Sequence, residues 1–477
     1  MSKEILVVDL DGSLIKTDLL FESFLSCFKN NPLKVLISIY ILFTKGIAEF
    51  KEFLALNSKI DFKTIPINEE VLEFIKKSKN KGKKLILVTG SHEIFSKKIS
   101  NAFKLFEMNF GSSKHINLVG KNKKKFLDLK FGKNKYSYIG DSIDDVKVWK
   151  NLNNNYVVNP NTFLIIYLKL KKINYEIISE NKFSFFKLLY SIRVHQWLKN
   201  LLIFLPALSA HNLESSTFFK NILAFISFSL IASSVYIIND FLDLKSDRTH
   251  PDKKNRPFAN GDVSIKVGFI LFGLVLGLSI FTSMILSQSF IILILSYLVI
   301  NGFYTLYFKR VVIFDLFILA ILYCFRIIAG SLTLNNLPSF WLLMFSFFFF
   351  FSLATIKRLA ELKIKNFDTL NIESGRGYKT QDITILSQIS MTTGFISVLV
   401  MALYFNSEEV QILYKEPYFL IIICFILTLW ISFILMQTHL GKMKYDPLLF
   451  AITDKTSLIC GLFIFILIIL SKYPIIF

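Results

Sequence analysis

The stretch Asn239-Asp-Phe-Leu-Asp-Leu-Lys-Ser-Asp-Arg-Thr-His-Pro-Asp-Lys-Lys-Asn-Arg-Pro257 decides the fold, because it directly follows a long apolar run. Its carboxylates Asp240, Asp243 and Asp247 are spaced i, i+3, i+7 and therefore share one helix face, near Asn239. Acids at the end of a membrane-buried helix are costly unless a cation compensates them. Mg²⁺ carrying a phosphorylated ligand is the obvious candidate, since Mg²⁺ takes one or two carboxylates plus phosphate oxygens. Basic residues that could hold the remaining phosphate charge follow at once: Arg248, Lys253, Lys254 and Arg256.

The composition divides the chain into a soluble part and a membrane part. The 477 residues are 53% hydrophobic and include 51 Phe, which exceeds what a soluble globular protein carries. Up to about residue 180, short apolar runs alternate with Lys- and Asn-rich stretches; from about 184, apolar runs near the bilayer-spanning length recur. We therefore predict a soluble α/β domain over 1–165, a linker over 166–184 and a membrane domain over 185–477. The chain opens on Lys3-Glu4 and a strand-like run without a signal peptide, so we expect the soluble domain in the cytoplasm.

Charge and cysteine usage exclude several classes of protein. The net charge is +20, but the Lys residues are spread through the soluble part and the loops without an aromatic-interleaved basic face. We expect no nucleic acid; attraction to an anionic leaflet and to phosphorylated substrates explains the charge. The cysteines are scattered without metal-ligand or CxxC spacing, which predicts neither zinc nor a disulfide framework: Cys27, Cys324, Cys424 and Cys460.

The membrane part contains nine candidate spans. They cover roughly 187–209, 217–239, 265–284, 288–308, 312–333, 339–360, 383–405, 417–437 and 452–471. Lys and Arg concentrate in the loops on one side, which predicts that this side is cytoplasmic. We therefore expect a multi-pass protein of the cytoplasmic (inner) membrane, with the acidic motif on the cytoplasmic side and the carboxyl terminus outside.

Three polar motifs follow apolar strands in the soluble part. They are Val7-Val-Asp9-Leu-Asp11-Gly12, Leu85-Ile-Leu-Val-Thr89-Gly-Ser91 and Tyr138-Ile-Gly140-Asp141-Ser-Ile-Asp144-Asp145. In an open α/β sheet the site lies at the carboxyl ends of the strands, so these motifs should converge there.

This set of motifs resembles the haloacid dehalogenase (HAD) superfamily of phosphotransferases, over about residues 3–160. The resemblance implies a Rossmann-like domain with a helical cap at about 15–80. It also implies Asp9 as the nucleophile, Asp11 as the general acid/base, Thr89 as a phosphate-binding hydroxyl, and Asp141 and Asp145 as acids that hold Mg²⁺ with Asp9. The motif's lysine is one of Lys121, Lys123, Lys124 and Lys125, and we favour Lys123. A degenerate domain kept for regulation or packing is the alternative. The apolar run 33–43 is too short to span, so it is either a buried cap helix, which we favour, or a patch resting on the membrane.

With its nine predicted helices and the 239–257 motif, the chain from about 185 to 475 resembles the UbiA superfamily of intramembrane prenyltransferases. Members place two Asp-rich motifs at the cytoplasmic ends of helices two and six, facing each other across a cavity. The second motif, DxxxD, is absent here, and Lys357-Arg358-Leu-Ala-Glu361 takes its place. Binding a lipid diphosphate through two Mg²⁺ ions requires acidic residues on both helices, whereas Lys and Arg can bind a lipid monophosphate directly.

The basic replacement looks like the polyprenyl-phosphate phosphoribosyltransferase branch, best known as decaprenyl-phosphate phosphoribosyltransferase. Further matches are Arg193-Val-His-Gln196-Trp197-Leu-Lys199-Asn200, Tyr304-Thr-Leu-Tyr307-Phe-Lys309, Arg326, Arg376-Gly-Tyr378, Asp446-Pro447 and Asp454-Lys455. We expect Asp446 and Asp454 to have structural or supporting roles.

The resemblance implies transfer of 5-phosphoribosyl from phosphoribosyl diphosphate to a polyprenyl phosphate. Asp240, Asp243 and Asp247 would act in catalysis through at least one Mg²⁺, and a second Mg²⁺ would lie in the HAD site. The HAD domain would remove the 5-phosphate of the lipid-linked product. Substrate contacts are expected from Lys199, Asn200, Asn239, Arg248, Lys253, Arg256, Tyr307, Lys309, Arg326, Lys357, Arg358, Glu361, Arg376 and Tyr378.

Alternatives stay open at this point. The chain could instead move a polyprenyl group from a polyprenyl diphosphate to a small or aromatic acceptor, or be a non-catalytic carrier or scaffold. Gln196 and Trp197 could only anchor a helix at the interface, and Lys357 and Glu361 could merely pair with each other. The 239–257 motif itself could be a solvated helix end with ion pairs.

Overall fold

The structure is a computed structural model that describes residues 4–180, 184–212, 214–367, 377–407, 410, 414–416, 418–443 and 446–472, with side chains of 364–367 left aside. The chain forms two compact units. One combines Met1–Val194 with Tyr236–Leu274, and the other combines His195–Val235 with Val275–Phe477. The first unit thus contains both the α/β part and the acidic motif at 239–257.

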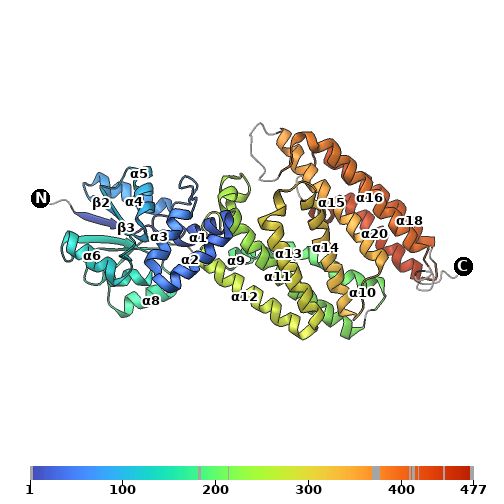
Figure 1. The fold of residues 1–477 in the computed structure, drawn as a ribbon, viewed down its shortest axis with the longest axis horizontal. Coiled ribbons are helices and arrows are strands. Elements are labelled where there is room, and N and C mark those ends of the chain that lie inside the picture. The colour runs from blue at the N-terminus through green and yellow to red at the C-terminus, as the bar shows by residue number, and fades with distance from the viewer. Residues whose placement is uncertain are drawn as a thin grey trace. The chain divides into compact units, whose positions relative to one another are not determined.

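The α/β part is built on a six-stranded parallel sheet (Figure 1). The strand order is β3-β2-β1-β4-β5-β6. The strands are β1 (Ile5–Val8), β2 (Lys84–His92), β3 (Met108–Ser112), β4 (Tyr136–Gly140), β5 (Asn155–Val158) and β6 (Glu176–Ser179). In the central strand, Val8 is in register with Leu87 of β2 and Ile139 of β4, so these three strands end at the same edge.

Alternate residues of the central strand face opposite cores, as the period of a strand requires. Leu6 and Val8 pack with α4 (Glu69–Asn80) and α5 (Glu93–Phe103). Val7 packs on the other face with α6 (Lys121–Phe131), α7 (Val146–Trp149) and α8 (Thr162–Leu170). Covering both faces is what a parallel sheet needs, and it explains why β1 is apolar throughout.

Three helices precede α4 in the connection from β1 to β2 and form the cap: α1 (Leu19–Asn30), α2 (Pro32–Lys45) and α3 (Ile47–Asn57). The favoured prediction that the run 33–43 forms a buried cap helix is wrong. In α2 only Val35 and Ser38 are buried, whereas Leu33, Tyr40 and Phe43 are exposed by 70%, 66% and 83%. The run has apolar residues on both sides of the helix, and the cap covers only one of them.

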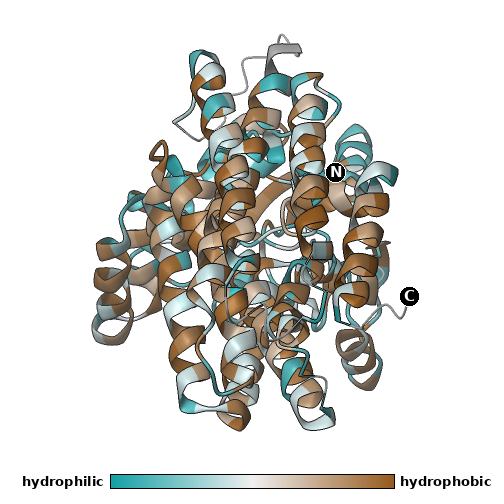
Figure 2. Cartoon of the chain, turned by 90° about the vertical axis from the view of Figure 1, so that its right-hand side faces the viewer, coloured by the Kyte–Doolittle hydropathy of each residue, from teal (hydrophilic) through white to brown (hydrophobic). Residues whose placement is uncertain are grey.

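The remaining part is helical, and eight helices among the described residues are long and apolar enough to cross a membrane, which indicates a membrane protein. They are α11 (Ser215–Thr249), α12 (Ile265–Leu286), α13 (Gln288–Leu306), α14 (Phe314–Thr333), α15 (Phe340–Phe367), α16 (Ile383–Phe405), α18 (Tyr418–His439) and α20 (Lys455–Lys472). Figure 2 shows hydrophobic residues along these long helices. In the second unit, α15 packs against α14, α16 and α18, and α18 packs against α20.

The first predicted span, 187–209, is not one continuous α-helix. It consists of α9 (Phe185–Ser191), a 3₁₀ segment (Val194–Phe204) and α10 (Leu205–Ser209). Arg193 has φ +54°, a left-handed conformation that ends α9, and Pro206 stands at the start of α10, where its missing N–H costs least. The predicted count of nine regular transmembrane helices is therefore not reproduced in the described residues.

Candidate functional site

The acids of the α/β part gather at the carboxyl edge of the sheet. Asp9 follows β1, and Asp141 and Asp145 follow β4, the strand paired with β1. One carboxylate oxygen from each of the three lies within 4.8 Å of the others. Three converging hard oxygen donors suit Mg²⁺.

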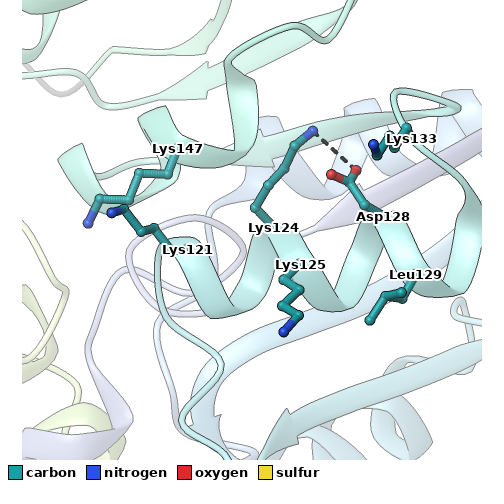
Figure 3. Close-up of a pocket in the computed structure, with 7 residues that line it drawn as sticks. All are labelled: Lys121, Lys124, Lys125, Asp128, Leu129, Lys133 and Lys147. Carbon is teal, nitrogen blue, oxygen red and sulfur yellow. Dashed lines mark ion pairs between the residues drawn. The ribbon is translucent and has the colours of Figure 1, made fainter.

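Lys123 of α6 supplies the positive charge of this cluster. Its Nζ lies 3.1 Å from Asp9 Oδ1 and 3.3 Å from Asp145 Oδ1, and its side chain is only 5% exposed. The same Nζ donates to the Tyr138 hydroxyl at 2.7 Å. The other three candidates project elsewhere and line a surface pocket together with Asp128, Leu129, Lys133 and Lys147 (Figure 3): Lys121, Lys124 and Lys125.

The electrostatics of the cluster fit an additional cation. Burial raises the pKa of Asp9 to about 7, although Lys123 opposes the shift. Burial likewise raises the pKa of Asp141 well above its usual range. Asp9 Oδ1 is buried, and Lys123 Nζ is its charged neighbour at 3.1 Å. A divalent ion held by Asp9 and Asp141 would remove the cost of crowding these carboxylates.

Asp145 positions the neighbouring groups. Its Oδ1 accepts a hydrogen bond from the Tyr138 hydroxyl at 2.7 Å, and its Oδ2 accepts from Ser142 Oγ at 2.8 Å. The backbone N–H groups of Asp141 and Ser142 also donate to Oδ2. Burial alone would raise the pKa of Asp145, but Lys123 and these hydrogen bonds hold it below its usual value. Asp145 therefore orients the loop that presents Asp141.

Gly12 leaves the room that Asp141 needs. It has φ +72°, and a Cβ at this position would lie 2.2 Å from Asp141 Oδ2. The glycine of the first motif is thus required by both its backbone conformation and the approach of the carboxylate.

Asp11 is tethered between β2 and the cap. Thr89 Oγ1 donates to Asp11 Oδ2 at 2.9 Å, and the backbone N–H of Leu19, the first residue of α1, donates to Asp11 Oδ1 at 2.9 Å. The Ser91 N–H donates to Thr89 Oγ1 and fixes its hydroxyl. The structure therefore brings Asp11 and Thr89 together beside Asp9.

Lys51 of α3 is a residue of this site that sequence reasoning missed. It is 8% exposed, and its Nζ donates to Gly90 O at 2.6 Å and to Asn117 Oδ1 at 2.8 Å. Burial lowers the pKa of Lys51, and the charges of Asp11 and Asp18 oppose this. No motif announces it, because its partners are 39 and 66 residues away along the chain.

The acidic motif lies at the carboxyl end of α11, which at 35 residues is longer than the roughly 20 needed to cross a bilayer. Asp240 is paired with Arg193, and Arg256 Nη1 lies 3.0 Å from Asp240 and 2.5 Å from Asp247. Asp243 faces the cap instead, 3.7 Å from Lys29 Nζ. Two buried carboxylates, Asp240 and Asp247, thus share an arginine and are hard oxygen donors suited to Mg²⁺, whereas the predicted third ligand, Asp243, is directed to the cap.

Arg248, predicted to contact substrate phosphate, is engaged by the cap. Its two Nη atoms lie 2.5 and 3.3 Å from the oxygens of Glu22 in α1, and its Nε donates to Ala259 O. The pair is buried, with side chains 6% and 8% exposed. Lys253 and Lys254 are exposed in the loop that follows, and Asn239 is half-buried beside Asp240.

In the second unit, two lysines share one carboxylate. Asp446 Oδ2 accepts from Lys199 Nζ at 2.8 Å and from Lys357 Nζ at 2.7 Å. Burial alone would raise the pKa of Asp446, but the two lysines hold it well below its usual range. Lys357 remains 33% exposed at its side chain. This Lys199–Asp446–Lys357 cluster joins residues from three of the predicted motifs of the membrane part.

Arg358 lies in a different environment from its neighbour. It is 2% exposed, its Nε donates to Asp315 Oδ2 at 2.8 Å, and its Nη1 donates to both oxygens of Glu361 at 3.0 Å. The Tyr378 hydroxyl also donates to Asp315. No motif in the sequence points to Asp315. The donors of Arg358 are thus directed at protein carboxylates, and Glu361 pairs with Arg358 here.

Arg326 is held deep in α14. It is 4% exposed, and its Nε donates to Asn200 Oδ1 at 2.8 Å. Its guanidinium carbon lies 5.1 to 5.9 Å from the ring centres of Phe228, Tyr297 and Tyr323. Tyr307 is exposed and Lys309 half-buried at the end of α13, whereas Arg376 lies outside the described residues.

Comparisons with known proteins match most of the chain. The model of the UbiA prenyltransferase family matches residues 200–405. The uncharacterized protein y4nM of Sinorhizobium fredii is 31% identical over 460 residues, which cover 96% of this chain and 89% of that protein. Nodulation protein NoeC of Azorhizobium caulinodans is 33% identical over 58% of this chain and 91% of its own length. Decaprenyl-phosphate phosphoribosyltransferase of Mycolicibacterium smegmatis is 32% identical over 37% of this chain and 57% of its own length.

Proposed function

Because this chain belongs to the UbiA prenyltransferase family, with a HAD-like domain at its amino terminus, we propose that it is a polyprenyl-phosphate phosphoribosyltransferase. The reaction moves 5-phosphoribosyl from phosphoribosyl diphosphate to a polyprenyl phosphate at the cytoplasmic face of the inner membrane. The observation that carries this proposal is the Lys199–Asp446–Lys357 cluster. It puts two lysines on one carboxylate at the helix end where a diphosphate-using relative would need acids for a second metal.

The donor diphosphate is assigned to the acidic motif. Asp240 and Asp247 would hold Mg²⁺, which when bound neutralises the departing diphosphate as a Lewis acid, while Asp243 lies beside Lys29 of the cap. Arg193 and Arg256 form ion pairs with Asp240, and their guanidinium groups would exchange this carboxylate for phosphate oxygens when the donor binds. Lys253 and Lys254 of the exposed loop add positive charge for the 5-phosphate.

The acceptor is assigned to the lysine cluster. Lys357, a third exposed, would bind the lipid monophosphate, and Lys199 would share its charge. A phosphate oxygen attacks the anomeric carbon, the bond from that carbon to the diphosphate breaks, and the diphosphate leaves with the bonding electrons. No general base is required, because the attacking oxygen is already anionic.

The HAD-like domain is assigned hydrolysis of the 5-phosphate on the lipid-linked product. Asp9 attacks phosphorus and forms an aspartyl-phosphate, while Asp11 gives a proton to the departing sugar oxygen and later takes one from water. Lys123, 3.1 Å from Asp9 Oδ1, favours the ionised form of Asp9 against the effect of burial, and Thr89 fixes Asp11. Asp9 and Asp141 would hold the Mg²⁺ that screens the incoming phosphate.

The test uses the full chain in membranes with ribose-labelled phosphoribosyl diphosphate and polyprenyl phosphate. Label should enter the lipid fraction, and Asp9→Asn should leave the lipid product with an additional phosphate detectable by mass spectrometry. Absence of labelled lipid from folded wild-type protein would refute the transferase assignment. Identical products from wild type and Asp9→Asn would refute the phosphatase assignment alone.

A further inference from the structure

Helix α2 carries apolar side chains on two opposite faces. On one face, Val35 packs with Phe50 and Leu54 of α3, and Ile41 and Leu42 join the same cluster. The described residues leave the other face exposed. Its exposed side chains are Leu33 (70%), Leu36 (64%), Ile37 (50%), Tyr40 (66%) and Phe43 (83%). Their spacing of three or four residues places them in one stripe along the helix.

A helix that is apolar all round belongs in a core or in lipid. The segment 32–45 contains no acid and carries Lys34 and Lys45 near its ends. Large contiguous apolar stripes are rare on water-exposed protein surfaces and mark interaction sites. Lysines at the ends and an aromatic ring on the apolar face are features of helices that lie in a membrane interface.

The neighbours of α2 point to lipid as the occupant. Within the first compact unit, α1 contacts two membrane helices: the Phe21 ring lies 5.6 Å from Phe269 of α12, and Lys29 Nζ donates to Leu242 O of α11 at 2.5 Å. Asn31 alone separates α1 from α2, serving as the last cap of one and the first cap of the other. The cap helix α2 therefore starts beside the ends of two spans, where a bilayer surface begins.

We propose that α2 lies in the lipid–water interface, with the stripe from Leu33 to Phe43 in contact with acyl chains. In this arrangement the cap is fastened to the bilayer surface. The phosphatase site, which the cap covers with Lys51, then opens where the headgroup of a lipid-linked substrate lies. The opening of the phosphatase site toward a lipid headgroup rests on the proposed function, whereas the position of α2 in the interface does not.

The position is tested by nitroxide labels on single cysteines in the full chain, reconstituted in phosphatidylcholine–phosphatidylglycerol nanodiscs. Labels at Ile37 and Tyr40 are compared with one at Leu56 of α3, which is exposed by the same 66% as Tyr40. The four native cysteines are buried and can be replaced by alanine. We expect oxygen, which concentrates in lipid, to relax the Ile37 and Tyr40 labels several-fold more than a water-soluble nickel chelate does. The Leu56 label should show the opposite preference.

Two outcomes would overturn the proposal. If the Tyr40 label behaves like the Leu56 label, the stripe faces water. If the Tyr40 and Ile37 labels are shielded from both reagents, protein covers the stripe, either another part of this chain or a second copy.

A second measurement addresses the consequence for catalysis. The double variant Tyr40→Asp, Phe43→Asp should lose hydrolysis of a lipid-linked phosphate ester several-fold while retaining hydrolysis of a soluble aryl phosphate. Equal losses on both substrates would contradict membrane seating as the cause. If wild type hydrolyses neither substrate, the proposed phosphatase function fails, while the spin labels still decide the position of α2.

Discussion

Breaking the Glu22–Arg248 pair should loosen the cap from the carboxyl end of α11. The two side chains are 8% and 6% exposed, and the guanidinium meets both carboxylate oxygens. Removing one partner of a buried pair strands the other charge and costs about 3–5 kcal/mol. Since every 1.4 kcal/mol is about a factor of ten, Glu22→Gln should shift the balance between attached and detached cap by about a hundredfold or more.

The assay is hydrogen exchange of the full chain in nanodiscs, followed in peptides covering 19–30 and 241–262. The matched control is Asp61→Asn, because Asp61 pairs with Lys245 of the same helix end at 3.3 Å but with side chains 34% and 66% exposed. Such an exposed pair contributes about 0–1 kcal/mol. Exchange should therefore rise in both peptides for Glu22→Gln and change little for Asp61→Asn.

The charge swap sharpens the test. Combining Glu22→Arg with Arg248→Glu restores an attractive pair, so protection should recover well above that of either single variant. If the swap protects no better than the singles, or if Glu22→Gln and Asp61→Asn exchange alike, the ion pair does not fasten the cap. The aromatic contacts of Phe21 and Phe24 with Phe269 would then be what holds α1 in place.

Three further predictions concern the two candidate sites. Lys123→Met should abolish phosphatase activity and lower the melting temperature of the HAD-like domain. Adding Mg²⁺ should restore part of the lost melting temperature. Lys125→Met on the same helix should change neither the activity nor the melting temperature in the same assays. Because the pKa of Asp9 is raised from 3.8 to about 7, the folded HAD-like domain binds a proton that the unfolded chain releases between these pH values. Without Mg²⁺, the melting temperature should therefore fall as pH rises from about 4 to about 7. Adding Mg²⁺ should make the melting temperature depend less on pH. Lys357→Ala should raise the KM for polyprenyl phosphate about tenfold or more and should change the KM for phosphoribosyl diphosphate little. Arg358→Ala should mainly reduce the yield of folded protein. Equal shifts of both KM values for Lys357→Ala would contradict a separate lipid-phosphate subsite.

The α/β site could be predicted closely because its residues follow strands. Asp9, Thr89 and Asp141 each follow an apolar run, and a parallel sheet with β1 between β2 and β4 brings those strand ends together. The register of the sheet therefore positions most of these side chains, and the strands themselves can be recognised in the sequence. Lys51 was not predicted, and Tyr138 was quoted without a role, because the roles of both depend on burial and on partners from other elements. The apolar pattern of α2 showed that the helix was hydrophobic, but not that the cap would cover only one of its faces.

The membrane part was harder to predict because the partners of its charged residues are distant in sequence. Arg248 and Arg358 both looked like phosphate ligands, yet Glu22 lies 226 residues from Arg248 and Asp315 lies 43 residues from Arg358. A buried arginine keeps its charge and must be paired, so its basic character alone does not make it a substrate ligand.

Counting charges within each cluster separates the two kinds of site. Arg358 faces two acids, Asp315 and Glu361, and these three side chains together carry an excess of negative charge. Lys199 and Lys357 face one acid, Asp446, and these three carry an excess of positive charge. The positively charged Lys199–Asp446–Lys357 cluster attracts an incoming phosphate, whereas the negatively charged cluster around Arg358 repels it. The adjacent residues Lys357 and Arg358 therefore differ: we propose that Lys357 serves the lipid phosphate, whereas Arg358 joins α15 to Asp315 of α14.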